Sequence, residues 1–136
     1  MSSVSIKGVL IGAAVDLGLT FLAGFAMVIA IVAQQGVDSL EALDDIVMPN
    51  SLVVAGYAVA AVTSAIAGYV AARIAGKGEL LNGALSSFLS VAIVLVSLIA
   101  DRSQAFGAGD AYDLVSAPLF GLIGGFLRAR QVRGRG

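Results

Sequence analysis

The chain has 136 residues, of which 59% are hydrophobic and only 12% are charged, and its mean hydropathy is +0.99. A soluble domain of this length needs more charge on its surface, so lipid is the expected solvent for most of the chain. The absence of cysteine and histidine excludes disulfides, thiolate nucleophiles, a Ser-His-Asp triad and the commonest metal ligand.

Four apolar stretches predict transmembrane helices, at residues 9–33, 52–75, 80–100 and 111–127. The first three reach the roughly 20 residues needed to cross a hydrocarbon core of about 30 Å. The fourth is shorter and contains Pro118, which predicts a kink that neighbouring helices can tolerate. The sequence therefore predicts an all-α fold, a four-transmembrane-helix bundle that forms a single integral membrane domain over residues 1–136.

The segment between the first two stretches is acidic. Asp38 and Glu41 fit a helix-starting pattern, and apolar residues recur beside them at helical spacing up to Val47. A short helix on the membrane surface and a polar loop with apolar anchors are both compatible with this segment.

The charges are divided between the two sides of the stretches. Seven of the eight basic residues fall on one side, at Lys7, Arg73, Lys77, Arg128, Arg130, Arg133 and Arg135. Seven of the nine acidic residues fall on the other, at Asp38, Glu41, Asp44, Asp45, Asp101, Asp110 and Asp113. The positive-inside rule then predicts a protein of the inner (cytoplasmic) membrane with both termini in the cytoplasm. The basic residues are expected to anchor this topology at lipid head groups, and no nucleic-acid partner is expected.

Small residues recur at every fourth position of the second stretch, at Gly56, Ala60, Ser64, Gly68, Ala72 and Gly76. The fourth stretch has the same pattern at Ala117, Gly121, Gly125 and Ala129. Such grooves let helix backbones approach closely in lipid. The pattern fits a helix of the same chain, a second copy in a homo-oligomer, or another membrane protein.

A weak internal repeat accompanies this packing pattern. Residues 68–73 and 125–130 both run from Gly through an aromatic residue to Arg, and each ends a hairpin of two stretches. Two tandem helical hairpins in the same orientation would form a parallel repeat.

Asp16 is the only acidic residue well inside an apolar stretch, roughly 10 Å deep at 1.5 Å per residue. An aspartate at a helix centre costs on the order of 2.5–3.5 kcal/mol to insert, so it should face the bundle. Matching depths suggests a proton or cation site that also contains Thr20, Tyr69, Ser86, Ser87 and Ser90, with Arg73 within reach. The alternative is an aspartate, protonated or paired with Arg73, that holds helices together.

Two resemblances follow from these residues. Residues 68–76, continuing into 80–85, resemble a turn in uncharacterised small four-helix bacterial membrane proteins, which implies a fold and a location without an activity. Residues 12–20, Gly-Ala-Ala-Val-Asp-Leu-Gly-Leu-Thr, resemble the first helix of small multidrug resistance transporters. That resemblance implies that Asp16, in place of the family's glutamate, binds protons and cationic drugs in alternation.

Two functions are compatible with these patterns. The first is a membrane protein that works by packing against itself or a partner, with no catalysis, cofactor or metal, because the chain lacks an activated nucleophile, a metal-ligand cluster and a paired carboxylate. The second is a proton- or cation-coupled small-molecule transporter that uses Asp16.

Overall fold

The computed structural model describes residues 3–35, 48–100 and 106–134, and the regular elements within these residues are all α-helices. They are α1 (Ile6–Gln35), α2 (Asn50–Ala75), α3 (Glu79–Leu85), α4 (Phe88–Ala100) and α5 (Ala108–Arg133). The all-α prediction is confirmed for this part of the chain. The acidic segment that was expected to form a surface helix or a loop lies almost entirely outside the described residues.

Three segments are long and apolar enough to cross a membrane: Ile6–Gln34, Asn50–Ala75 and Glu79–Ala100. They correspond to the first three predicted spans. Helix α5 has 26 residues, as many as α2, and would extend for about 39 Å at 1.5 Å per residue. Its composition is less apolar, because Asp110, Asp113 and three arginines lie within it. Helix α5 therefore has the length, although not the apolar composition, of the three candidate spans.

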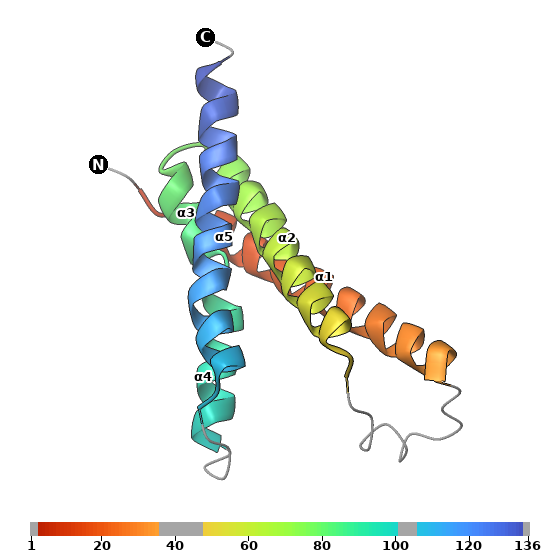
Figure 1. Cartoon of the computed structure of the whole chain (residues 1–136). Helices are drawn as coiled ribbons and strands as arrows, with labels where there is room; N and C mark the ends of the chain where they lie inside the picture. The colour runs from red at the N-terminus through yellow and green to blue at the C-terminus, as the bar shows by residue number, and fades with distance from the viewer. Residues whose placement is uncertain (1–2, 36–47, 101–105, 135–136) are drawn as a thin grey trace.

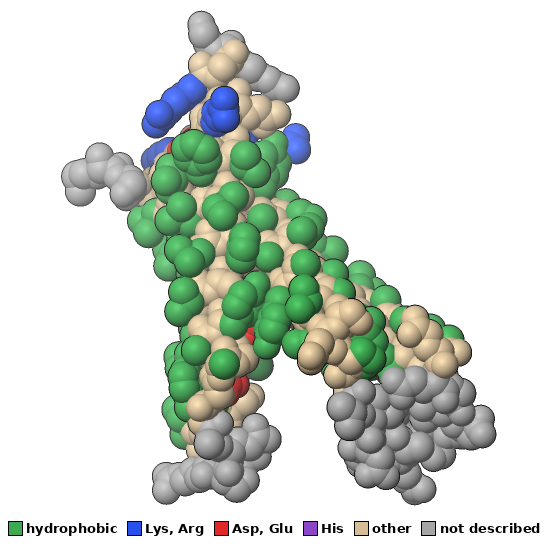
Figure 2. Space-filling model, viewed as in Figure 1, with side chains coloured by type: hydrophobic (Ala, Val, Ile, Leu, Met, Phe, Trp, Pro, Cys, Tyr) green, Lys and Arg blue, Asp and Glu red, His purple; other side chains and the backbone are tan. Residues whose placement is uncertain are grey.

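The helices form a V (Figure 1). Both ends of the chain lie at the end of the bundle where α2, α3 and α5 pack together. From there, α1 and α2 run to one side, whereas α4 and the first half of α5 run to the other. Lysine and arginine side chains gather where the helices converge (Figure 2). We call this the basic end (Lys7, Arg73, Lys77 and Arg128), and we call the opposite end, where the two arms separate, the open end.

Glycines allow α2, α3 and α5 to touch through their backbones at the basic end. A Cβ on Gly68 in α2 would overlap the backbone of Gly121 in α5. A Cβ on Gly83 in α3 would lie 2.8 Å from the Cα of Gly125, again closer than real side chains approach. Close packing of this kind is a main source of helix association in lipid, and here it joins helices of one chain.

A second face of α2 holds α1. A Cβ on Gly12 in α1 would lie 2.7 Å from the Cβ of Ala71 and 2.8 Å from the Cβ of Ser86. Ala67 and Ala71, which are fully buried, lie one residue before Gly68 and Ala72 of the predicted stripe. Helix α2 is therefore packed on two adjacent faces, by α1 and by α5.

The other small residues of the predicted stripe have different surroundings. The Cβ of an alanine at Gly56 would meet only the side chain of Met27, at an ordinary 3.5 Å. Gly76 has a φ of 65°, a left-handed conformation, and ends α2 with a hydrogen bond to Ala72. Neither residue makes a close helix–helix contact within the described part of the chain.

The third predicted span is broken, which corrects the expectation of one continuous helix. Helix α3 ends at Leu85 and α4 begins at Phe88, with Ser86 and Ser87 between them. The Ser86 amide donates to the carbonyls of both Asn82 and Gly83, and its hydroxyl also donates to Gly83 at 2.7 Å. Serine hydroxyls compete with the backbone for such carbonyls, which explains why the helix can be interrupted here. Helix α5, in contrast, continues through Pro118.

Candidate functional site

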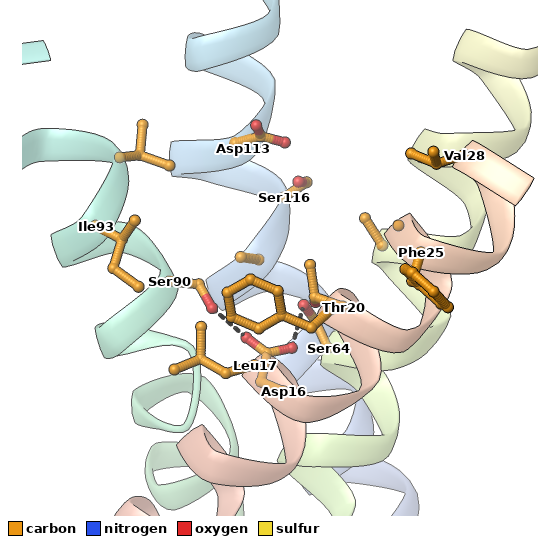
Figure 3. Close-up of a pocket in the computed structure, with 15 residues that line it drawn as sticks. Asp16, Leu17, Thr20, Phe25, Val28, Ser64, Ser90, Ile93, Asp113 and Ser116 are labelled. Carbon is orange, nitrogen blue, oxygen red and sulfur yellow. Dashed lines mark hydrogen bonds between the residues drawn. The ribbon is translucent and has the colours of Figure 1, made fainter. Parts of the chain in front are cut away.

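Asp16 is almost completely buried, with 1% of its surface exposed. One carboxylate oxygen accepts a hydrogen bond from the Ser64 hydroxyl of α2 at 3.0 Å, and the other accepts one from the Ser90 hydroxyl of α4 at 2.6 Å (Figure 3). Burying a carboxylate is unfavourable unless donors replace the water that it loses. The two serines therefore hold Asp16 between the two arms of the V.

The local packing explains this placement. Asp16 follows Gly12 by four residues, so it lies on the face of α1 that contacts α2 and Ser86 at Gly12. Ser64 precedes Gly68 by four residues on α2. Ser90 lies in the first turn of α4, immediately after the break. The carboxylate thus lies where the close packing of the basic end gives way to the separated arms.

A cavity of about 540 Å³ begins at Asp16 and lies between the two arms. Its walls are mostly apolar and include Leu17, Phe21, Phe25 and Val28 of α1 and Ile93 and Val94 of α4. The polar lining residues are Asp16, Thr20, Ser64, Ser90, Asp113 and Ser116. None of the lining residues that the structure describes is a lysine or an arginine. The volume is typical of small-molecule sites, and an apolar wall with a few polar groups is their usual composition.

A tyrosine pair joins α2 to α5 towards the open end. The rings of Tyr57 and Tyr112 have centroids 4.4 Å apart at an angle of 48°, and the Tyr112 hydroxyl donates to the Tyr57 carbonyl at 3.3 Å. Helices α1 and α4 face each other across the cavity (Figure 3). Helix α4 has no buried residue, and Phe21 and Phe25 of α1 are 74% and 69% exposed. The helices on the α2–α5 side of the cavity are thus in contact through the tyrosine pair, whereas those on the α1–α4 side are largely exposed.

The structure brings together three of the six residues that were predicted to form the site. Thr20 and Ser90 line the cavity with Asp16. Tyr69 instead donates to Gln131 at 2.6 Å, while Ser86 and Ser87 donate to backbone carbonyls. The side chain of Arg73 is exposed, and the hydrogen bonds of Asp16 come from serines.

Three polar residues of the cavity were not among those predicted from the sequence to form the site. Ser64 had been assigned to helix packing, and its signal was its position one turn before Gly68 on the stripe of small residues. Asp113 and Ser116 were not included in the site. Their three-residue spacing, with Ala117 adjacent, places them on one face of α5, and this was the available signal.

Comparison with protein families, with characterised proteins and with solved structures finds no match to this chain. The resemblances to small four-helix membrane proteins and to multidrug transporters therefore remain predictions. The function has to be inferred from the geometry of the cavity.

Proposed function

We propose that this chain is a four-span protein of the inner (cytoplasmic) membrane, with its basic end in the cytoplasm. We further propose that the cavity binds a small lipophilic cation whose charge lies against Asp16, as the substrate site of a proton- or cation-coupled transporter. The division of charge along the chain supports the orientation. The length of α5 supports the fourth crossing.

The observation that carries the cation site is a buried carboxylate at the inner end of an apolar cavity without a basic lining residue. Ser64 and Ser90 each donate a hydrogen bond to one oxygen of the buried Asp16 carboxylate. Hydroxyl groups offset only part of the free-energy cost of burying that charge. A cation with an apolar body would offset more of it and would also fill the apolar walls.

The packing of the small residues makes a pure assembly role the weaker alternative. The closest glycine contacts join helices of the same chain, and they are made at Gly68, Gly83, Gly121, Gly124 and Gly125. These grooves are therefore already filled in a single copy. The cavity, in contrast, has a lining whose chemistry defines a ligand class.

Binding of radiolabelled tetraphenylphosphonium to the purified protein in neutral-lipid nanodiscs tests this proposal. We expect saturable binding by the wild type and its loss in Asp16→Asn, a substitution that retains hydrogen-bonding atoms without the charge. Asp110→Asn is the matched control, because Asp110 caps α5 and does not line the cavity. Equal binding by Asp16→Asn, or no binding by a folded wild type, would reject the cation site and redirect the search to membrane-protein partners.

A further inference from the structure

We propose that the cavity selects ligands that carry two cationic groups on one apolar body, with one charge at Asp16 and the other at Asp113. This inference rests on the proposed cation site and specifies its ligand class. It concerns a residue, Asp113, that would otherwise be regarded as a solvated acid near the end of a helix.

Asp16 of α1 and Asp113 of α5 line the same cavity from different helices. Figure 3 shows them at opposite ends of it, with the Ser116 side chain between them. Asp16 is buried, whereas Asp113 is exposed, so one carboxylate lies at the inner end of the cavity and the other at its mouth.

Two carboxylates line this cavity, and none of its described lining residues is basic. A monocation bound at Asp16 would leave Asp113 without a counter-charge from the ligand. A dication would place a positive group near each carboxylate, and attraction between charges is stronger beside apolar walls than in bulk water.

The surface between the two carboxylates is mostly apolar. The walls there are formed by aliphatic and aromatic side chains, with Leu17 and Ile93 on facing helices. An apolar linker would be buried against these walls at a gain of roughly 25 cal/mol per Å². A polar linker, such as that of a sugar-based dication, would lose its hydration without sufficient partners. The preferred ligand therefore has charged ends and an apolar middle.

A matched series of ligands tests this selectivity. Competition with radiolabelled tetraphenylphosphonium in neutral-lipid nanodiscs would compare α,ω-bis(trimethylammonium)alkanes of increasing length with alkyltrimethylammonium ions of the same lengths. In the wild type, we expect a dication of suitable length to bind about tenfold more tightly than its monocation, which is a modest coupling energy for a partly exposed charge pair. Asp113→Asn should abolish this preference, because it should weaken the binding of dications about tenfold more than the binding of monocations.

Asp110→Asn is the control, because it removes a neighbouring carboxylate of α5 that does not line the cavity, and it should retain the preference. The inference is overturned if dications and monocations bind equally to the wild type, or if Asp113→Asn keeps the preference. In both cases Asp16-dependent binding would persist, and the proposed cation site would stand. If neither ligand shows binding that depends on Asp16, the proposed function itself fails.

Discussion

Ser87, at the break between α3 and α4, donates a hydrogen bond of 3.0 Å to the carbonyl oxygen of Ala117, the residue before Pro118 in α5. This bond places the interruption of the third apolar segment beside the proline of α5. The glycine contacts among α2, α3 and α5 lie on the basic side of this level or at it, whereas the cavity lies on the other side. Ser87 therefore marks the boundary between the packed and the separated parts of the bundle.

Replacing Ser87 tests how much its hydrogen bond to Ala117 contributes to the free energy of unfolding. Ser87 is fully buried, and Ser87→Ala would remove its donor with little change in volume. We expect the free energy of unfolding to fall by about 1 kcal/mol. Chemical denaturation in mild detergent, followed by circular dichroism, would measure the change. Ser51→Ala, at an exposed position in the first turn of α2, is the control. Equal effects of the two variants would show that the Ser87 hydrogen bond does not stabilise the fold.

The glycine contacts predict a contrast between two positions on the same helix. Gly68→Ala should lower the free energy of unfolding by about 1–3 kcal/mol, because the new methyl group would overlap the backbone of Gly121. Gly56→Ala should be neutral or stabilising by up to about 1 kcal/mol, since its surroundings accept a methyl group and alanine favours helix. Unfolding experiments on both variants provide the measurement. A Gly68→Ala variant as stable as Gly56→Ala would show that the two helices do not pack this closely.

The serine partners of Asp16 should control how tightly a cation binds. Ser64→Ala and Ser90→Ala each remove one donor to the carboxylate, and hydrogen bonds to charged groups are among the stronger ones. Each substitution should weaken binding of tetraphenylphosphonium about tenfold. Thr63→Ala is the control, because the Thr63 hydroxyl donates to the Ala60 carbonyl of its own helix and does not line the main cavity. Unchanged affinity in both serine variants would show that the hydrogen bonds from Ser64 and Ser90 to Asp16 do not contribute to cation binding.

Transport is tested separately from binding. In sealed proteoliposomes with a proton-sensitive dye, a gradient of tetraphenylphosphonium should drive protons across the membrane in the opposite direction. Asp16→Asn should abolish this movement, because the variant lacks the buried carboxylate that is proposed to alternate between a proton and a cation. Asp110→Asn should behave like the wild type. If the protein binds the cation but no protons move, the coupled-transport proposal is rejected, and the protein is one that only binds cations.

The orientation can be measured because the chain has no cysteine of its own. Phe106→Cys lies at an exposed position at the open end, and Lys77→Cys lies in the turn at the basic end. A membrane-impermeant maleimide should label Phe106→Cys in intact cells and label Lys77→Cys only after the membrane is opened. The reverse pattern would invert the proposed topology, and labelling of both in intact cells would contradict a single orientation.

The elements that could be predicted from sequence are those with a large free-energy signal. The positions of the apolar segments follow from the length needed to cross a bilayer, and the burial of Asp16 follows from the cost of exposing a carboxylate to lipid. The pairing of Asp16 with Ser90 could be predicted because residues at equal depth on neighbouring helices can meet.

The remaining features have weaker signals. The break at Ser86 and Ser87 was missed because serine costs little in a membrane helix and bonds readily to backbone carbonyls. The contact face that contains Ala67 and Ala71 could not be identified from the sequence, because an alanine-rich helix has small residues on every side. Asp113 was overlooked because an acid near a helix end is usually solvated, and only the tertiary arrangement places it at a cavity.

The side chain of Asn82 links the beginning of the chain to a turn formed much later. It is fully buried, accepts a hydrogen bond from the Ser5 amide at 2.7 Å and donates to the Ser3 carbonyl at 3.2 Å. Ser5 and Asn82 are 77 residues apart, a separation that takes roughly 4–15 seconds to synthesise at about 5–20 residues per second. The residues that lead into α1 thus acquire this partner only after the ribosome has made the first turn of α3. The final seating of residues 3–5 is therefore a late event in biosynthesis, although they directly precede α1, which is made before the other described helices.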